Sequence, residues 1–372
     1  MIKICYVIGT LNIGGTEKQL LILVKGLDKK RFLPVVISLR KKGHLKKDFE
    51  ASGIKVIEIG KRFKIDIAFF FKLFNVIKKE KPVIVHTFLF TSNTWGRIAA
   101  ILNKTPLLIS SEQCVDSWKK WHHILIDKIL LYFTKIVTVN SYAVKNFYQK
   151  SEHIPEPKIR VIHNGTEIKS TNTQNLNSLL NKKKELNLEK AEYIISCAGR
   201  FTEQKGFIYL IKAIPFILKN FPQSYFIFIG DGPLQNIFKK ETEKLAINSN
   251  IIFTGYRKDV MDIFSISDII VVPSMFEGMP NVISEAMAVG KPVIGTDIPE
   301  ISEIVKDGKN GLLVPVKNSG ALAEKIIYLL KNPSLILKMG NEGYKTVVNE
   351  YSSGKMITSY ENLYLELSKT KN

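Results

Sequence analysis

The chain has 372 residues, of which 45% are hydrophobic, and this length suffices for two domains that each bury a core. This composition excludes wholesale disorder, and lysines break the apolar runs well short of the roughly 20 residues that a bilayer-spanning helix needs. Met1 leads directly into an alternating strand without a charged, then apolar leader, and the three cysteines lack metal-type spacing. These features predict a cytoplasmic protein with two domains.

The net charge of +20 is concentrated in the first half of the chain. Residues 1–164 hold 29 Lys and Arg against 12 Asp and Glu, whereas residues 165–372 hold 25 against 22. A basic half predicts an anionic partner, such as membrane lipid, nucleic acid or a polyanionic substrate. A generally lysine-rich composition is the simpler alternative, but it does not explain why the positive charge is segregated.

The first half alternates expected strands with helical patterns, which predicts a doubly wound parallel sheet. The expected strands are Ile2–Ile8, Pro34–Leu39, Ile54–Ile59, Val83–His86, Leu107–Ser110, Ile136–Val139 and Ile159–Ile162. After the first strand, Gly14 and Gly15 open a helix that runs to about Leu27. Their spacing is not the dinucleotide pattern G-x-G-x-x-G, but Gly15 would let the backbone approach a ligand closely.

Residues 166–190 are rich in Ser, Thr, Asn, Lys and Glu, and they predict a linker, with or without a short helix, between two domains. We place the first domain at residues 1–165 and the second at residues 191–351. A C-terminal helix within residues 352–372 has an apolar face that could pack back on the first domain. The strands expected in the second domain are Tyr193–Ala198, Tyr225–Ile229, Ile251–Phe253, Ile269–Val272 and Pro292–Gly295.

The most informative stretch is residues 273–285, which lie between a buried strand and a helix expected at Val282–Val289. Glu277 lies in the turn and Glu285 about one helical turn into the helix, so both can face one cleft. Ligands of open α/β sheets bind outside the carboxyl ends of the strands, and a helix N-terminus there favours a phosphate. Because carboxylates accept hydrogen bonds from sugar and ribose hydroxyls, the stretch predicts a nucleotide-sugar site. Taken alone, the two glutamates fit better a helix-start carboxylate that stabilises the helix dipole and an exposed glutamate on the helix.

This stretch, which reads Ser-x-x-Glu-Gly-x-Pro-x-x-x-x-Glu-Ala and is followed by Gly290–Thr296, resembles the donor-site signature of retaining glycosyltransferases of family 4. Other motifs agree with the family in order and spacing: Gly14–Glu17, Asn164–Gly165, Gly199–Gly206, Gly230–Pro233, Phe253–Gly255 and Asn310–Val314. The resemblance covers essentially the whole chain and is strongest in residues 193–315. It implies the glycosyltransferase-B fold, in which two α/β, Rossmann-like doubly wound domains face each other across a cleft. The first domain would bind the acceptor and the second the nucleotide-activated sugar.

The resemblance also implies roles for individual residues. Glu285 would bind the ribose hydroxyls, and Glu277 would bind the sugar that is transferred. Arg200 and Lys205 match the family's pair of phosphate-binding cations, which would stabilise the charge that grows on the leaving diphosphate. The backbone next to the donor would come from Gly15, Gly278, Met279, Pro280, Asn281 and Val282. The sequence has no Asp-x-Asp triplet, which fits catalysis without a metal or another cofactor.

The acceptor side departs from the family pattern. Many relatives carry a histidine after the strand that corresponds to Leu107–Ser110, whereas this chain has Glu112 and Gln113 there. Glu112 is therefore one acceptor-side candidate. His86, at the end of an expected strand, is another, with a hydrogen-bonded structural histidine as its alternative. A front-face displacement needs no protein base if the leaving phosphate takes the proton of the acceptor.

Two basic and aromatic stretches could meet an anionic membrane surface. The first runs from Lys61 to Phe74 and the second from Trp118 to Trp121. Helices that lie in a membrane interface combine residues of these kinds. The alternative is that the phenylalanines at residues 69–74 belong to the core of the first domain.

These observations together predict a retaining hexosyltransferase that is peripherally associated with the inner face of the cell membrane. It would move a hexose or N-acetylhexosamine from a nucleotide diphosphate sugar to a glycan or lipid-linked acceptor, for a surface polysaccharide. A nucleotide-sugar 2-epimerase or a phosphorylase on the same fold is an alternative. A non-catalytic protein that binds nucleic acid through the basic half is a more remote one, and we do not expect a nucleic-acid partner. The donor nucleotide, sugar, acceptor, linkage and oligomeric state do not follow from the sequence.

Overall fold

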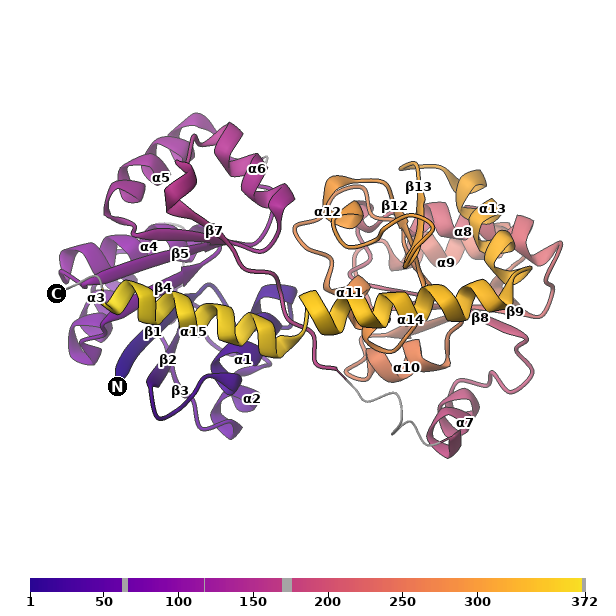
Figure 1. The fold of residues 1–372 in the computed structure, drawn as a ribbon, viewed down its shortest axis with the longest axis horizontal. Helices are drawn as coiled ribbons and strands as arrows, with labels where there is room; N and C mark the ends of the chain where they lie inside the picture. The colour runs from indigo at the N-terminus through magenta and orange to yellow at the C-terminus, as the bar shows by residue number, and fades with distance from the viewer. Residues whose placement is uncertain (62–65, 117, 169–175, 370–372) are drawn as a thin grey trace. The chain divides into compact units, whose positions relative to one another are not determined.

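The computed structural model of the chain describes residues 1–61, 66–116, 118–168 and 176–369. The chain divides into two compact units (Figure 1). The first unit comprises Met1–Gly165 and Ser353–Asn372, and the second comprises Thr166–Ser352. The chain therefore passes from one unit to the other twice, after Gly165 and after Ser352.

The first unit is built on a seven-stranded sheet with the order β3-β2-β1-β4-β5-β6-β7, in which neighbouring strands are parallel. Its strands are β1 (Ile2–Ile8), β2 (Phe32–Ser38), β3 (Lys55–Glu58), β4 (Ile84–Phe88), β5 (Leu107–Glu112), β6 (Ile136–Val139) and β7 (Ile159–Val161). The sequence predicts all seven to within two residues at each end. The strand order reverses between β1 and β4, which is the topological switch point of this sheet.

The helices of the first unit include one from the far end of the chain. They are α1 (Gly15–Gly26), α2 (Lys46–Ala51), α3 (Ile67–Glu80), α4 (Phe90–Leu102), α5 (Trp121–Phe133), α6 (Tyr142–Ser151) and α15 (Ser353–Lys369), with a short 3-10 turn η1 (Glu156–Lys158). Figure 1 shows α15 in yellow along this unit. Its apolar face is buried against β1 and β2, where Tyr364 packs on Tyr6 and Phe32. The C-terminal helix is thus part of the first unit's core.

The second unit holds a six-stranded parallel sheet with the order β10-β9-β8-β11-β12-β13. Its strands are β8 (Tyr193–Ala198), β9 (Ser224–Ile229), β10 (Ile251–Gly255), β11 (Ile269–Val272), β12 (Val293–Thr296) and β13 (Gly311–Val314). Its helices are α7 (Leu176–Glu185), η3 (Glu203–Lys205), α8 (Phe207–Leu218), α9 (Gln235–Lys244), η4 (Asn248–Asn250), α10 (Val260–Ile266), α11 (Asn281–Ala288), α12 (Pro299–Ser302), α13 (Ser319–Leu330) and α14 (Pro333–Glu350). Here the order reverses between β8 and β11. Two parallel sheets with interleaved helices confirm the predicted α/β class.

The segment predicted as a linker, residues 166–190, differs from that expectation in its described part. Thr166 already belongs to the second unit, where its hydroxyl hydrogen-bonds to that of Ser284 at 2.7 Å. α7 packs against α10, and the ammonium group of Lys182 lies 2.6 Å from a carboxylate oxygen of Asp259. Leu188 is fully buried. The polar composition of this segment therefore reflects an exposed helix of the second unit rather than a free connection.

Candidate active site

The candidate donor site lies at the switch point of the second unit's sheet. β8 and β11 are parallel neighbours, so the chain leaves both strands at the same edge of the sheet. The segment with Arg200 and Lys205 follows β8, and the turn with Glu277 follows β11. Open α/β sheets bind their ligands outside the carboxyl ends of the strands at such a point.

Gly206 allows the loop after β8 to touch the turn after β11. Its φ of 63° is in the left-handed region, and a Cβ there would lie 2.0 Å from the carbonyl oxygen of Pro273. Two further hydrogen bonds join the segments: Met275 N donates to Gln204 O at 2.8 Å, and Gln204 Nε2 donates to Phe276 O at 2.9 Å. The contact therefore requires glycine at residue 206.

Lys205 and Glu277 form an ion pair where these two segments meet. The ammonium nitrogen of Lys205 lies 2.6 Å from Oε1 of Glu277, and the hydroxyl of Ser274 donates to the same oxygen at 2.6 Å. Glu277 is only 6% exposed, and burying a polar group is costly unless it has hydrogen-bond partners such as these. The structure thus brings together one cation and one carboxylate that the sequence assigns to the same site.

α11 begins directly after this turn, in nearly the range that the sequence predicts. Its N-cap, Pro280, supplies no capping side chain, and the N-terminus of a helix carries partial positive charge. Glu285 is half-buried on this helix. The remaining predicted donor-side positions also lie here: Gly278 and Met279 are buried in the turn, and Asn281 and Val282 are half-buried in the first turn of α11. This end of α11 can attract an anion.

Arg200 has an exposed side chain in the loop after β8. The loop after β9 lies in close contact with this segment. Gly230 has a φ of 130°, and a Cβ there would lie 2.1 Å from Gly199 O. Phe201 N donates to Asp231 O at 2.7 Å and fixes the same contact. The glycines of two sequence motifs therefore hold the backbone next to Arg200.

The structure places a further acidic residue, Glu300, near Glu277, and the sequence does not predict it as part of the site. Glu300 is largely buried in α12, which follows β12. Burial raises the pKa of Glu300, and the negative charges of Glu277 and Glu303 add to that effect. The signal in the sequence is its position just after the Gly290–Thr296 motif, at the same edge of the sheet.

His86 does not line an accessible site, and this corrects the expectation of an acceptor-side role. β4 continues to Phe88, so His86 lies inside the strand rather than at its end, and it is fully buried. Its Nδ1 is 2.9 Å from the hydroxyl of Tyr364, and its Nε2 is 2.7 Å from that of Ser111. Burial lowers the pKa of His86 to about 3. The alternative of a hydrogen-bonded structural histidine describes it.

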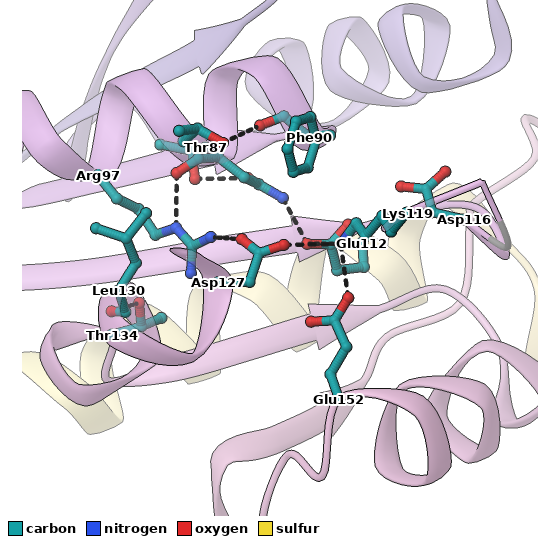
Figure 2. Close-up of polar contacts among 12 residues, drawn as sticks. Thr87, Phe90, Arg97, Glu112, Asp116, Lys119, Asp127, Leu130, Thr134 and Glu152 are labelled. Atoms are coloured by element: carbon teal, nitrogen blue, oxygen red, sulfur yellow. Dashed lines mark hydrogen bonds and ion pairs between the residues drawn. The ribbon is translucent and has the colours of Figure 1, made fainter. Parts of the chain in front are cut away.

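Glu112, the other acceptor-side candidate, ends β5 and is buried in a cluster of charges (Figure 2). Asn93 Nδ2 donates to its Oε1 at 2.8 Å, and the hydroxyl of Tyr148 donates to its Oε2 at 3.2 Å. Burial raises the pKa of Glu112 to about 7, and the attraction of Lys119 opposes this shift. The carboxylate is thus engaged inside the unit, which does not support a role as an acceptor-side base.

The rest of this buried charge cluster is not predicted from the sequence. The ammonium group of Lys119 lies 2.9 Å from Asp127 Oδ2 and 2.8 Å from Glu152 Oε1, and Arg97 pairs with the other oxygen of Asp127. Figure 2 shows these side chains converging from α4, α5, the loop before α5 and the end of α6. Burial alone would lower the pKa of Lys119, but the surrounding carboxylates outweigh burial and raise it. The cluster thereby ties α4, α5 and the end of α6 to β5 in the first unit.

Gly15 opens α1 at the carboxyl end of β1 and is exposed. Before it, Gly14 is extended, and a Cβ there would lie 2.3 Å from Oε2 of Glu17. Glu17 is buried, which raises its pKa. The glycine pair therefore leaves room for a carboxylate that folds back over the start of α1.

The two basic and aromatic stretches differ in burial. Residues 62–65 of the first stretch lie outside the described residues. Phe69 and Leu73 in the same stretch are buried, whereas Ile67 and Phe71 are exposed, so the described part of this stretch contributes to the core with only some of its apolar side chains. In the second stretch, Trp118 and Trp121 are both exposed.

The described part of the chain offers neither a cluster of metal ligands nor a membrane-spanning helix. Among these residues, no group of three or more His, Cys, Asp or Glu side chains is arranged to hold a metal ion. No helix within the same residues has the length and apolar character to cross a membrane.

Comparison with known families decides the class of this protein. A family model described as "Glycosyl transferases group 1" matches residues 180–346, and one described as "Glycosyltransferase Family 4" matches residues 13–170. The chain is a glycosyltransferase of the family 4 type. Membership of this family confirms the predicted retaining hexosyltransferase. It does not support an epimerase or a phosphorylase.

Curated relatives of the family 4 glycosyltransferase align over most of its length. It is 28% identical over 316 residues to the UDP-Gal:alpha-D-GlcNAc-diphosphoundecaprenol alpha-1,3-galactosyltransferase of Escherichia coli, covering 82% of this chain and 81% of that protein. It is also 28% identical over 317 residues to the capsular polysaccharide biosynthesis glycosyltransferase CapM of Staphylococcus aureus, covering 81% of this chain and 83% of that protein.

Solved structures confirm the glycosyltransferase-B fold. A glycosyltransferase from Rickettsia africae ESF-5 superimposes with a TM-score of 0.89 at 25% identity, covering 99% of each chain. Anabaena Alr3699/HepE, in complex with UDP-glucose, superimposes with a TM-score of 0.88 at 18% identity, covering 98% of this chain and 100% of that one.

Proposed function

We propose that this glycosyltransferase moves a hexose or N-acetylhexosamine from a nucleoside diphosphate sugar to a lipid-linked or glycan acceptor during synthesis of a surface polysaccharide. The observation that carries the proposal is the Lys205–Glu277 ion pair at the switch point of the second unit, beside the N-terminus of α11. The names of the Escherichia coli and Staphylococcus aureus relatives support the acceptor and the pathway. The UDP-glucose complex of the Anabaena structure supports the donor.

In this proposal the donor lies along the edge formed by the loops after β8 and β11. Lys205, Arg200 and the N-terminus of α11 face the diphosphate, since all three carry positive charge or a positive dipole end. Glu277 accepts hydrogen bonds from hydroxyls of the transferred sugar, and Glu285 accepts them from the ribose. The backbone from Gly278 to Val282 lies against the sugar and phosphates.

The transfer step exchanges one bond at the anomeric carbon for another on the same face. The bond between that carbon and the donor's phosphate oxygen breaks while the acceptor's hydroxyl oxygen forms the new glycosidic bond. The acceptor's proton passes to the leaving phosphate oxygen. Negative charge therefore grows on the diphosphate. Cations that are already fixed next to it stabilise this charge and lower the barrier, because they need not move during the reaction. Protein cations fill the electrostatic role that a divalent ion fills in metal-dependent transferases.

The proposal uses no protein base on the acceptor side. Glu112 is engaged with Asn93 and Tyr148 inside the first unit, and His86 is buried with both ring nitrogens engaged. The first unit supplies the acceptor-binding surface, and its excess of positive charge suits a diphosphate-linked acceptor. Such an acceptor resides in a membrane, so the enzyme works at the inner face of the cell membrane as a peripheral protein.

A donor screen followed by a transfer assay tests the proposal. A ligand at 100 times its dissociation constant stabilises the folded state by about 2.7 kcal/mol, which thermal unfolding detects. We expect one nucleotide series (UDP-, GDP- or dTDP-sugars) to raise the melting temperature, and the stabilising sugar to be transferred to a diphosphate lipid. Stabilisation by none of them, or release of an epimerised nucleotide sugar without transfer, would contradict the proposal.

A further inference from the structure

α5 turns its one carboxylate inward and its large apolar side chains outward. Only Asp127 and Leu130 of its 13 residues are buried. Five of its large apolar side chains are at least half exposed: Trp121 at 75%, Leu125 at 50%, Ile129 at 57%, Tyr132 at 82% and Phe133 at 53%. The spacing of these residues puts them on one face of the helix, opposite the buried pair. A helix of a globular protein ordinarily has the reverse arrangement.

Ion pairs and the burial of Leu130 hold α5 on the first unit. Asp127 is paired with both Arg97 and Lys119 inside the buried charge cluster (Figure 2). Figure 2 also shows Leu130 and Thr134 on the same inward side, and Thr134 Oγ1 donates to Leu130 O at 2.8 Å. The ion pairs of Asp127 and the burial of Leu130 thus attach α5 by its inward side, and the outward apolar face makes no part of that attachment.

The exposed charged side chains on α5 and at its two ends are all positive, and one carboxylate, Asp116, lies beside Trp118 at the edge of the face. Lys120, Lys128 and Lys135 are exposed, and the only carboxylate between Trp118 and Lys135 is the buried Asp127. The face thus combines tryptophan, tyrosine and aliphatic residues with a row of lysines. Trp118, which is also exposed, extends it into the loop before α5.

We propose that this α5 face is the surface by which the protein lies on an anionic phospholipid bilayer. It comprises Trp118, Trp121, Leu125, Ile129, Tyr132 and Phe133. Indole and phenol rings favour the headgroup boundary, aliphatic side chains enter the acyl region, and lysines attract anionic headgroups. At 13 residues α5 is about 20 Å long, so it lies in the interface rather than across the bilayer. The inference rests on the membrane association proposed above and names the surface responsible.

A second copy of the chain fits this face less well than a bilayer does. In a two-fold symmetric dimer the same patch meets itself, so the lysines at residues 120, 128 and 135 would face their counterparts. Like charges opposed at an interface are unfavourable, whereas anionic headgroups neutralise them. The charge of the face therefore favours lipid.

Sedimentation of the full-length protein with phospholipid vesicles tests the inference. The vesicles contain either phosphatidylcholine alone or equal parts of phosphatidylcholine and phosphatidylglycerol. We expect binding to the anionic vesicles only, and weaker binding when NaCl is raised from about 50 to about 500 mM. The triple variant Leu125→Ser/Ile129→Ser/Tyr132→Ser should bind at least about tenfold more weakly. The control is Ile237→Ser/Phe216→Ser/Leu337→Ser, three exposed apolar positions of the second unit, and it should bind like the wild type.

Each outcome of this experiment decides something. Wild-type protein that stays in solution, or a triple variant that sediments like the wild type, overturns the inference. A dimer in light scattering that dissociates in the triple variant, without vesicle binding, assigns the face to a second copy instead. The vesicles contain neither donor nor acceptor, so vesicle binding is measured independently of sugar transfer. A protein that binds vesicles but transfers no sugar contradicts only the proposed function. A protein that transfers sugar but does not bind vesicles contradicts only this inference. The variants change exposed side chains, and unaltered circular dichroism would verify that they fold.

Discussion

The ammonium nitrogen of Lys205 lies 2.6 Å from Oε1 of Glu277, which is 72 residues further along the chain. The two side chains meet because the loops after the neighbouring strands β8 and β11 are joined through Gly206 and Gln204. In the proposed reaction the donor's phosphates compete for Lys205 while its sugar hydroxyls bind Glu277. The pair therefore positions both groups before the donor arrives, which is how preorganised charge lowers a barrier.

Replacing Lys205 should reduce turnover far more than stability. Lys205→Ala removes one fixed positive charge from the leaving diphosphate, and we expect kcat to fall by about 10²- to 10³-fold. The fold should persist, because Ser274 still donates to Glu277. Steady-state kinetics with the donor found in the screen, together with thermal unfolding, measures both effects.

The matched control for this experiment is Lys212→Ala, which removes the same charge from an exposed position on α8. It should leave kcat within about twofold of the wild type, since exposed charges far from the chemistry contribute little. A Lys205→Ala enzyme that turns over like Lys212→Ala would remove Lys205 from the catalytic machinery.

Gly206→Ala should be strongly destabilising, because two effects add. The left-handed backbone costs about 1–2 kcal/mol for a residue with a Cβ, and that Cβ would collide with the carbonyl of Pro273. We expect the free energy of unfolding in urea to fall by at least about 3 kcal/mol. Gly308→Ala isolates the first effect, because Gly308 has a φ of 72° with open space around its Cβ position, and it should cost only about 1–2 kcal/mol. Equal losses in the two variants would show that the contact with Pro273 is not tight.

Glu112 should make the stability of the protein fall as the pH rises. Burial raises its pKa to about 7 from an ordinary value of 4.5, so between these values the folded protein holds a proton that the unfolded chain has released. This contribution is fully present below about pH 4.5 and is lost as the pH rises through about 7. From pH 5 to pH 8, the wild type should lose roughly 1–3 kcal/mol of unfolding free energy relative to Glu112→Gln.

Urea unfolding of both proteins at the two pH values measures this difference. Glu324→Gln, at an exposed position on α13, is the matched control for loss of one carboxylate. Parallel pH profiles for the wild type and Glu112→Gln would contradict the account of Glu112 as a buried, partly protonated carboxyl.

Tyr364→Phe should destabilise the first unit. The hydroxyl of Tyr364 accepts from Tyr6 at 3.2 Å and lies 2.9 Å from Nδ1 of His86, and all three side chains are buried. Removing it leaves two buried polar groups short of a partner, which costs about 1–3 kcal/mol. Tyr328→Phe, a half-exposed tyrosine on α13, should change the unfolding free energy by less than about 0.5 kcal/mol. A null effect of Tyr364→Phe would mean that α15 is held by apolar contacts alone.

Much of the fold and of the donor site could be predicted because both follow from local patterns. Short apolar runs between helical periodicities identify the parallel strands, and the strand–turn–helix pattern places Glu277 at a sheet edge, whereas Lys205 is assigned to the same site only through the resemblance to family 4. β13 escaped prediction because its run is short and begins at Gly311, immediately after Asn310, which together read as a turn. Glu300 escaped because nothing local distinguishes it from an exposed glutamate.

The first unit shows where local patterns stop being informative. Arg97, Lys119, Asp127 and Glu152 are widely spaced charges that resemble solvated side chains, and only the tertiary fold brings them into one buried cluster. That cluster also reverses the ordinary interpretation of α5, whose apolar stripe would be expected to face inward. His86 was misplaced for a smaller reason, because β4 runs two residues beyond its expected end.

The most direct test of the central claim is to follow a labelled hexose from the donor to a lipid-linked diphosphate acceptor. The donor is the nucleotide sugar that stabilises the protein, and nuclear magnetic resonance of the product reports the anomeric configuration. We predict a product with the configuration of the donor, formed by the wild type and by Lys212→Ala but at least about 100-fold more slowly by Lys205→Ala. A product of inverted configuration, or equal rates in all three enzymes, would contradict the account.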